Sequence, residues 1–148
     1  MTLPPNYTLH SGSPDVTSYL HLRAASGLTP VTPAQGAAAV TGSWYACYIS
    51  YTDPTTKESK AIAQGRIISD GGWYFHLADM AVLPEHRRLG LGEAILKHLL
   101  GYIKDHAPDG KPYVNLFADG PGRRLYSKNG FVDAMPHSLG MVWKDPAA

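Results

Sequence analysis

Two arginines and two glycines stand where an apolar segment passes into a regularly patterned one. Arg87-Arg88-Leu89-Gly90-Leu91-Gly92 follows an apolar run that stops at Pro84, and apolar residues then recur at three- and four-residue intervals. The first backbone N–H groups of a helix have no partner within it and carry the positive end of its dipole. Glycines let a bulky anion approach these groups, and arginines add charged donors. The loop is therefore a candidate pyrophosphate site.

Taken alone, this loop also fits a tight turn beside a solvated basic pair. It is not a Walker loop, because no Lys-Ser or Lys-Thr pair follows the glycines, and the three-glycine dinucleotide pattern is incomplete. The surrounding sequence therefore has to decide between a turn and a phosphate site.

Periodicity and turn residues predict the elements that must position this loop. A strand is predicted over 73–82, and a helix with one apolar face over 90–104. Further strands are predicted over 7–10, 43–52, 61–68, 113–118, 131–132 and 141–143, and helices after Asp15, from Thr32 and over 121–129. This order, with a crossover helix between later strands, predicts an α/β or α+β sheet.

Length and charge restrict the class of protein. The chain has 148 residues, a formal net charge of +1 and 44% hydrophobic residues, which predicts one globular domain over residues 1–148. So small a charge argues against a nucleic-acid partner. We see neither a signal-peptide pattern nor the roughly 20 apolar residues of a membrane span. We therefore expect a cytoplasmic protein with no membrane partner.

The sequence offers little for disulfide, thiol or metal chemistry. Its one cysteine, Cys47, lies within a predicted strand, where a small buried hydrophobe is the better interpretation. The seven histidines lack the spacing of metal ligands, so no metal site is expected.

Residues 62–131 closely resemble the GNAT superfamily of acyl-CoA-dependent N-acyltransferases. The resemblance rests on the Arg-x-x-Gly-x-Gly loop at 87–92, on Ala81-Val82-Leu83-Pro84-Glu85 before it, and on Leu125-Tyr126-Ser127-Lys128-Asn129-Gly130-Phe131. It implies a mixed, mostly antiparallel sheet of six to seven strands, splayed at the centre and flanked by about four helices. It also implies acetyl-CoA as co-substrate and direct attack by an amine, with no covalent enzyme intermediate.

The resemblance assigns cofactor-binding residues by position. In the family, the strand before the loop separates from its neighbour and pairs with the pantetheine arm, and the matching residues are Met80, Ala81 and Val82. The loop that follows would hold the pyrophosphate through Arg87, Arg88, Leu89, Gly90, Leu91 and Gly92. Where the family often has an asparagine that contacts the cofactor, this chain has Asp119, which could instead cap the next helix.

Two proton transfers need catalytic groups. The resemblance assigns Tyr126 as the general acid toward the departing thiolate, and packing of its helix is the alternative. His76 lies where family members carry the base, and an ordinary histidine suits proton acceptance near neutrality; a half-buried structural histidine is the alternative. Strand alternation predicts that Asp79, the competing base, faces away from His76 as a structural acceptor. His76 would then share its face with Ala78, Met80 and Val82.

A small-molecule amine is the expected acceptor. Residues 20–32, which form the acceptor wall in the family, are mostly apolar and lack an acidic cluster for a basic protein tail. An aromatic lining could come from Trp44, Tyr45, Trp73 and Tyr74. The alternatives are acetylation of protein N-termini or lysines, a CoA-binding regulatory module and a nucleotide-binding loop. Homodimers are common in the family, so a homodimer stays open.

Overall fold

The computed structural model describes residues 2–147, which form two compact units divided between Leu116 and Phe117. The first unit contains a sheet in the order β1-β2-β3-β4-β5, in which β5 runs parallel to β4 and all other neighbours are antiparallel. Its strands are β1 (Tyr7–Ser11), β2 (Tyr45–Thr52), β3 (Ser59–Ser69), β4 (Tyr74–Val82) and β5 (Tyr113–Asn115). The predicted mixed, mostly antiparallel sheet is confirmed.

Four α-helices lie within the described residues, as predicted. They are α1 (Val16–Ala25), α2 (Pro33–Gly42), α3 (Leu91–His106) and α4 (Arg123–Lys128), and a short 3-10 helix, η1 (Pro84–His86), precedes α3. The predicted starts of α1 and α2 are confirmed, because Asp15 accepts from Ser18 N–H (3.1 Å) and Thr32 forms a capping box with Gln35. Among residues 2–147, no helix has the length and apolar character needed to cross a membrane.

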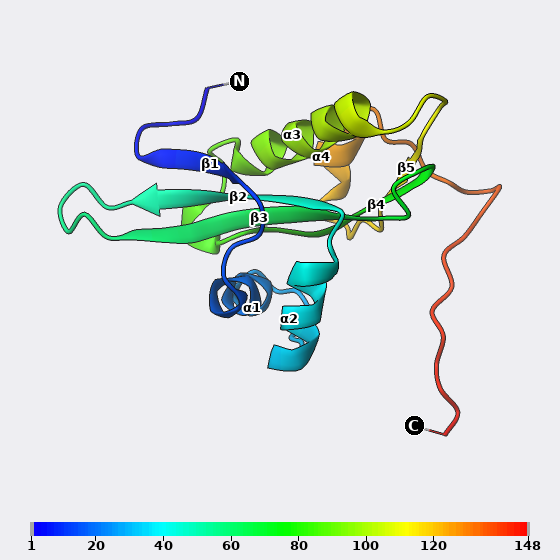
Figure 1. The fold of residues 1–148 in the computed structure, drawn as a ribbon, viewed down its shortest axis with the longest axis horizontal. Coiled ribbons are helices and arrows are strands. Elements are labelled where there is room, and N and C mark those ends of the chain that lie inside the picture. Colours follow the sequence, from blue (N-terminus) through cyan, green and yellow to red (C-terminus); the bar gives the residue numbers. More distant parts are fainter. Residues whose placement is uncertain (1, 148) are drawn as a thin grey trace. The chain divides into compact units, whose positions relative to one another are not determined.

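The helices of the first unit cover both faces of its sheet (Figure 1). On one face α1 contacts β3 and β4 and packs against α2, whereas α3 contacts β2, β3 and β4 on the other. We call these the α1/α2 face and the α3 face. Most of the predicted apolar stripe of α3 is buried in the core, namely Leu91, Ile95, Leu96, Leu99 and Ile103, whereas its sixth member, Leu100, is half-buried.

Gly65 of β3 lets α3 approach the sheet closely. A Cβ at this position would lie 2.6 Å from Cγ2 of Ile95 and 2.7 Å from Sδ of Met80. Both distances are shorter than normal contacts, so any side chain here would displace α3 or Met80. The Met80 sulfur lies on the same side of Gly65 as Ile95 of α3, so the Met80 side chain is on the α3 face.

The strands predicted at 131–132 and 141–143 are absent from the described residues, so the sheet has five strands rather than six or seven. In the second unit, residues 129–147 form neither helix nor strand. Val132, Met141 and Trp143 are 90%, 93% and 79% exposed. Apolar residues favour a strand when its pleated surface packs against neighbours, and such packing cannot be read from a run of two or three residues.

Candidate functional site

The strands β4 and β5 pair only along the first part of β4. Pairing begins at Tyr74–Tyr113 and ends at His76–Asn115, although β4 continues to Val82. The second half of β4 therefore extends beyond β5 with one edge open. This is the separation of strands that the resemblance implies.

The backbone groups at this open edge belong to Met80 and Val82. Leu83 N–H donates to Ile62 O of β3 (2.9 Å), and successive backbone groups along a strand alternate in direction. Ala81 therefore directs its N–H and C=O toward β3, whereas Met80 and Val82 direct theirs toward the open edge. An extended ligand arm could pair with these groups as an added strand.

A β-bulge interrupts β4 at Asp79 and Met80. The pairing with β3 shifts between Gln64 and Arg66, so that Gly65 lies opposite two residues of β4. Asp79 has a φ of 57°, in the left-handed region that is uncommon for residues other than glycine. A backbone kink is thus built into the strand beside its open edge.

The predicted alternation of side chains along β4 is wrong beyond Ala78, because the bulge inserts one residue. His76 lies opposite Ile68, two residues from Arg66, and this places His76 on the α1/α2 face. Asp79 contacts α1 and so lies on that face as well. Met80 faces α3 instead of sharing a face with His76.

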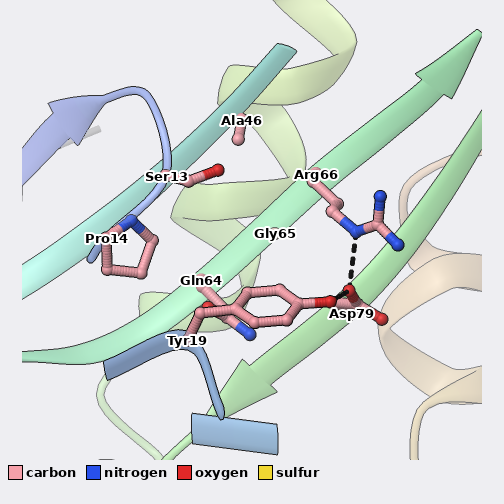
Figure 2. A pocket seen from close by; sticks show the side chains of 8 residues that line it. All are labelled: Ser13, Pro14, Tyr19, Ala46, Gln64, Gly65, Arg66 and Asp79. Atoms are coloured by element: carbon pink, nitrogen blue, oxygen red, sulfur yellow. Dashed lines mark hydrogen bonds and ion pairs between the residues drawn. The ribbon is translucent and has the colours of Figure 1, made fainter. Parts of the chain in front are cut away.

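Three side chains bind the carboxylate of Asp79. The Tyr19 hydroxyl donates to it, and Arg66 Nε of β3 donates to Oδ2 over 2.6 Å (Figure 2). Arg23 Nη1 of α1 also donates to this carboxylate. The Asp79 side chain is only 9% exposed. Burial, and then the hydrogen bond to Asp79, raise the pKa of Tyr19, so its hydroxyl remains a donor. We call these four residues the Asp79 cluster; it joins the bulge to α1 and favours a structural role for Asp79.

A small cavity adjoins the Asp79 cluster (Figure 2). It measures about 170 Å³, counting space open to solvent, and is lined by Ser13, Pro14, Tyr19, Ala46, Gln64, Gly65, Arg66 and Asp79. Gln64 is buried, and its amide atoms have no hydrogen-bond partner among the described residues. Neither His76 nor the open-edge residues line this cavity, so it is distinct from the open edge of β4.

The loop before α3 has two residues in left-handed conformation. Arg88 has a φ of 65° and Gly90 a φ of 78°, and α3 begins at Leu91. The N–H groups of residues 91–93 precede the first intrahelical bond, from Ala94 N–H to Gly90 O (3.1 Å). Such groups bind anions at helix starts, as the sequence predicts for this loop.

Arg87 connects this loop to two other elements. Its Nε donates to Val82 O at the open edge (3.1 Å), and its Nη2 donates to Ser26 O after α1 (3.3 Å). Arg88 and Leu89 are exposed. Sequence reasoning identified the charge of Arg87 but not these two carbonyl contacts, which depend on where α1 ends in space.

The predicted base, His76, is half-buried where β4 and β5 separate. Its Nδ1 lies 2.6 Å from Oδ1 of Asn115. Sequence reasoning missed Asn115, because only the parallel pairing of β4 with β5 brings the two residues together. The available signal was an amide within the otherwise apolar strand predicted over 113–118, of which the structure keeps only Tyr113–Asn115.

Two of the four aromatic residues proposed as an acceptor lining pack elsewhere. The ring of Trp44 lies edge-on to Phe75 (centroids 5.0 Å apart) and Tyr102 (5.3 Å), and Tyr45 stacks on Tyr102 (3.5 Å). These contacts involve α3, so Trp44 and Tyr45 stabilise the packing of that helix.

The other two, Trp73 and Tyr74, surround Tyr113 at the start of β5. Ring centroids lie 5.0 Å apart for Trp73–Tyr113 and 5.4 Å apart for Tyr74–Tyr113. Trp73, Tyr74 and Tyr113 are 57%, 42% and 39% exposed, and we call them the aromatic cluster. Tyr74 precedes His76 by two residues, so they share a face about 7 Å apart along the strand.

His86 holds the beginning of the loop against the first strand. Its Nδ1 lies 2.6 Å from Oη of Tyr7, and its ring also contacts Tyr51 (centroids 5.1 Å apart). Burial lowers the pKa of His86; Lys60 acts in the same direction and Glu85 in the opposite one. A neutral imidazole therefore connects β1 to the candidate phosphate loop.

Tyr126 and Asp119 belong to the second unit. Asp119 Oδ1 accepts from Gly122 N–H (3.0 Å) in the turn before α4, but it makes no side-chain cap to that helix, whose N-cap residue is Gly122. Tyr126 is half-buried, with its ring edge-on to Phe131 (centroids 5.8 Å apart). Burial, and then the charge of Asp119, raise the pKa of Tyr126, so Oη keeps its proton at neutral pH as a proton donor must.

Cys47 is buried, and burial raises the pKa of its thiol to about 12. The thiol is therefore protonated and unsuited to nucleophilic attack. Within the described part of the chain, no group of three or more His, Cys, Asp or Glu side chains could hold a metal ion.

Solved structures share this fold over most of the chain. A probable acetyltransferase of unknown function from meticillin-resistant Staphylococcus aureus is 30% identical, with a TM-score of 0.83 over 93% of this chain and 98% of that one. The ribosomal-protein-S18-alanine N-acetyltransferase of Escherichia coli has 21% identity and a TM-score of 0.67, over 86% of this chain and 79% of that one. Glucosamine-6-phosphate N-acetyltransferase from Arabidopsis thaliana has 17% identity and a TM-score of 0.64, over 94% of this chain and 98% of that one.

The sequence comparisons give one match and one negative result. No curated protein matches the chain. The family model of the acetyltransferase (GNAT) domain matches residues 43–133, which include the open edge of β4, the loop before α3 and all of α4. The chain therefore belongs to the GNAT acetyltransferase family.

Proposed function

We propose that this protein transfers the acetyl group of acetyl-CoA to the primary amine of a small molecule. Family membership supports acetyl transfer. The observation that carries the finer proposal is the position of His76, which lies where β4 and β5 separate and two residues from the exposed aromatic cluster. Because the family model spans both compact units, we further propose that residues 1–148 act as one domain.

The open edge and the loop fit an acyl-CoA. Met80 and Val82 would pair with the extended arm, while Ala81 between them anchors the strand to β3. The pyrophosphate would be held at the start of α3 by Arg88, Leu89, Gly90, Leu91 and Gly92. Acetyl-CoA, when bound, supplies an acetyl group activated as a thioester.

Two further residues complete the proposed cofactor site. Arg87 would exchange its bonds to neutral carbonyls for bonds to phosphate, because hydrogen bonds between charged partners are stronger. Asp119 would act through the turn before α4, where its carboxylate accepts from Gly122 N–H.

The chain's own side chains would move two protons. His76 accepts a proton from the ammonium group of the acceptor, which leaves the nitrogen lone pair able to attack the acyl carbon. As the new carbon–nitrogen bond forms, the carbon–sulfur bond breaks and Tyr126 donates its Oη proton to the departing sulfur. The amide nitrogen then releases its second proton to solvent, and Tyr126 and His76 return to their starting protonation states by exchange with solvent. Attack is direct, and Cys47 takes no part because its thiol is buried and protonated.

The aromatic cluster favours an acceptor with an apolar or aromatic body. Exposed rings bury apolar area efficiently, and their faces attract cations such as an ammonium group. At about 7 Å along the strand from His76, the cluster could contact the body of an amine whose nitrogen reaches the base. The Asp79 carboxylate on the same face is already bound by two arginines, so it offers no anionic groove for a basic peptide.

The test is release of free CoA thiol from acetyl-CoA across a panel of small amines and a panel of peptides with free N-termini or lysines. We expect small amines with apolar bodies to stimulate release most, and His76→Gln to abolish the stimulation. His98→Gln is the matched control, because His98 lies on α3 and pairs with Tyr45 (2.7 Å). Preference for peptides would favour the protein acetyltransferase alternative, and CoA binding without release would favour a binding module.

A further inference from the structure

We propose that Asn115 is a positioning residue that sets the tautomer of His76. Its side-chain carbonyl holds the ring proton on Nδ1 and thereby leaves the lone pair on Nε2. The catalytic consequence rests on the proposed function, in which His76 is the base. The tautomer itself is a property of the protein and can be measured whether or not an acceptor is known.

The sheet, rather than a mobile loop, sets the geometry of this pair. His76 and Asn115 are the last paired residues of β4 and β5, and His76 is also paired with Ile68 of β3 on its other side. Their side chains therefore project from neighbouring strands on one face, and Nδ1 lies 2.6 Å from Oδ1. A site built on strands in this way holds a catalytic ring in one orientation.

The chemistry of the two groups decides where the proton lies. A neutral imidazole has one N–H donor and one acceptor nitrogen, whereas an amide oxygen only accepts. With Oδ1 facing Nδ1, the proton is on Nδ1, and Nε2 is the nitrogen that can take a proton. If the amide were reversed, Nδ2 would face the ring and the proton would move to Nε2.

Packing gives no reason for an amide at this position. Nδ2 of Asn115 is buried and has no hydrogen-bond partner among the described residues, and an unsatisfied buried donor lowers stability. Asn115→Leu keeps the branched shape and the number of side-chain heavy atoms, and it removes this unsatisfied donor together with the acceptor that faces Nδ1 of His76. Because the two effects oppose each other, we expect a small change in thermal stability, which is measured beside activity. Loss of activity without loss of stability is the pattern expected of a residue retained for function.

The residues that flank this pair on the α1/α2 face of the sheet include both neutral and charged groups. The titratable neighbours on β4 and β5 are Tyr74 and Tyr113, and Ile68 on β3 is apolar. Further along the face, Arg66 and Asp79 bind each other. A neutral amide thus orients His76 without the charge that a carboxylate partner would add.

Nitrogen-15 NMR of the full chain, labelled at histidine, tests the tautomer directly, with His76 assigned by the signal lost in His76→Gln. We expect the Nδ1–H pattern in the wild type and a shift toward Nε2–H in Asn115→Leu. An Nε2–H pattern in the wild type, or an unchanged tautomer in Asn115→Leu, would overturn the proposal. Neither result depends on finding an acceptor, so failure here is distinct from failure of the proposed function.

Kinetics with an active amine test the consequence. We expect Asn115→Leu to lower kcat about tenfold or more, with KM for acetyl-CoA unchanged. Asn115→Asp keeps an acceptor at Nδ1 and should restore most of kcat, with the acidic limb of the pH profile moved to higher pH because the carboxylate stabilises the imidazolium. Lys111→Ala, at an exposed residue before β5, is the control. Equal rates and pH profiles for wild type, Asn115→Leu and Asn115→Asp would contradict a positioning role.

Discussion

Arg66 Nε donates to Oδ2 of Asp79 over 2.6 Å, and so joins β3 to the bulge of β4. The ion pair lies where the backbone of β4 turns into the left-handed region, next to the edge proposed to bind the cofactor. Arg23 adds a second cation and also donates to Thr29 O in the connection between α1 and α2 (2.6 Å from Nη2). One buried carboxylate thus holds the kink and, through Arg23, the connection on the predicted acceptor side.

Removing this carboxylate should destabilise the protein strongly. Asp79→Ala leaves two buried arginines without their anion, and breaking a buried pair in this way costs about 3–5 kcal/mol. Urea unfolding followed by circular dichroism measures the change. Asp133→Ala is the control, because it breaks an exposed pair with Arg123 and should cost less than about 1 kcal/mol. Similar losses in both variants would contradict a structural role for the Asp79 cluster.

Gly65→Ala should affect both stability and cofactor binding. The added methyl group would overlap Ile95 of α3 and the sulfur of Met80, and such overpacking costs about 1–3 kcal/mol. Because Met80 lies at the open edge, KM for acetyl-CoA should rise more than kcat falls. Gly101→Ala on α3 has open space around its new methyl and should stabilise the protein by up to about 1 kcal/mol. If Gly65→Ala behaved like Gly101→Ala, the close packing of α3 would be disproved.

Arg87→Ala should weaken acetyl-CoA binding about tenfold or more, since hydrogen bonds to charged groups contribute about 1.5–3 kcal/mol. We expect the rise in KM for acetyl-CoA to shrink at high salt, because ions screen an exposed charge. Steady-state kinetics at two salt concentrations measure both effects. Lys97→Ala, which removes an exposed lysine on α3, should leave KM unchanged. A rise in KM independent of salt would mean that Arg87 acts only through its carbonyl contacts.

His86 should make stability depend on pH. Burial lowers the pKa of His86 in the folded protein below its ordinary value of about 6.5. Its contribution to stability is therefore complete above about pH 6.5 and is lost as pH falls through the folded-state pKa. Melting temperatures from pH 8 to 5 should fall less steeply for His86→Asn than for the wild type. Parallel curves for the two proteins would show that the bond to Tyr7 does not couple to protonation.

Tyr126→Phe should lower kcat roughly a hundredfold or more at neutral pH, because it removes the proposed proton donor. Since the pKa of Tyr126 is raised above its ordinary value of about 10, the wild type should keep this proton across the neutral range and lose activity only at strongly alkaline pH. A pH profile of kcat for both proteins tests this. The melting temperature of the variant is the control. An unchanged melting temperature would show that the ring still packs against Phe131 and that the fall in kcat comes from the lost hydroxyl.

Much of the fold is encoded locally. The capping residues Asp15 and Thr32, the apolar stripe of α3 and the phosphate-type loop before it all follow from spacing over a few residues. The strands predicted at 131–132 and 141–143 are wrong because strand formation does not depend on local pattern alone. Their apolar residues satisfy a local pattern, but a strand also needs a partner elsewhere in the chain, and sequence spacing contains no information about that partner.

At the candidate site, residue types and spacing pointed to the loop 87–92, and the resemblance to the family proposed His76 and Tyr126. Only the tertiary structure determined which face each side chain of β4 occupies, since the bulge at Asp79 depends on Gly65, on α3 and on two arginines from other elements. Pairing His76 with Asn115 likewise required the parallel register of β5. Local patterns record what a segment prefers, whereas bulges and cross-strand contacts arise from packing between segments distant in the sequence.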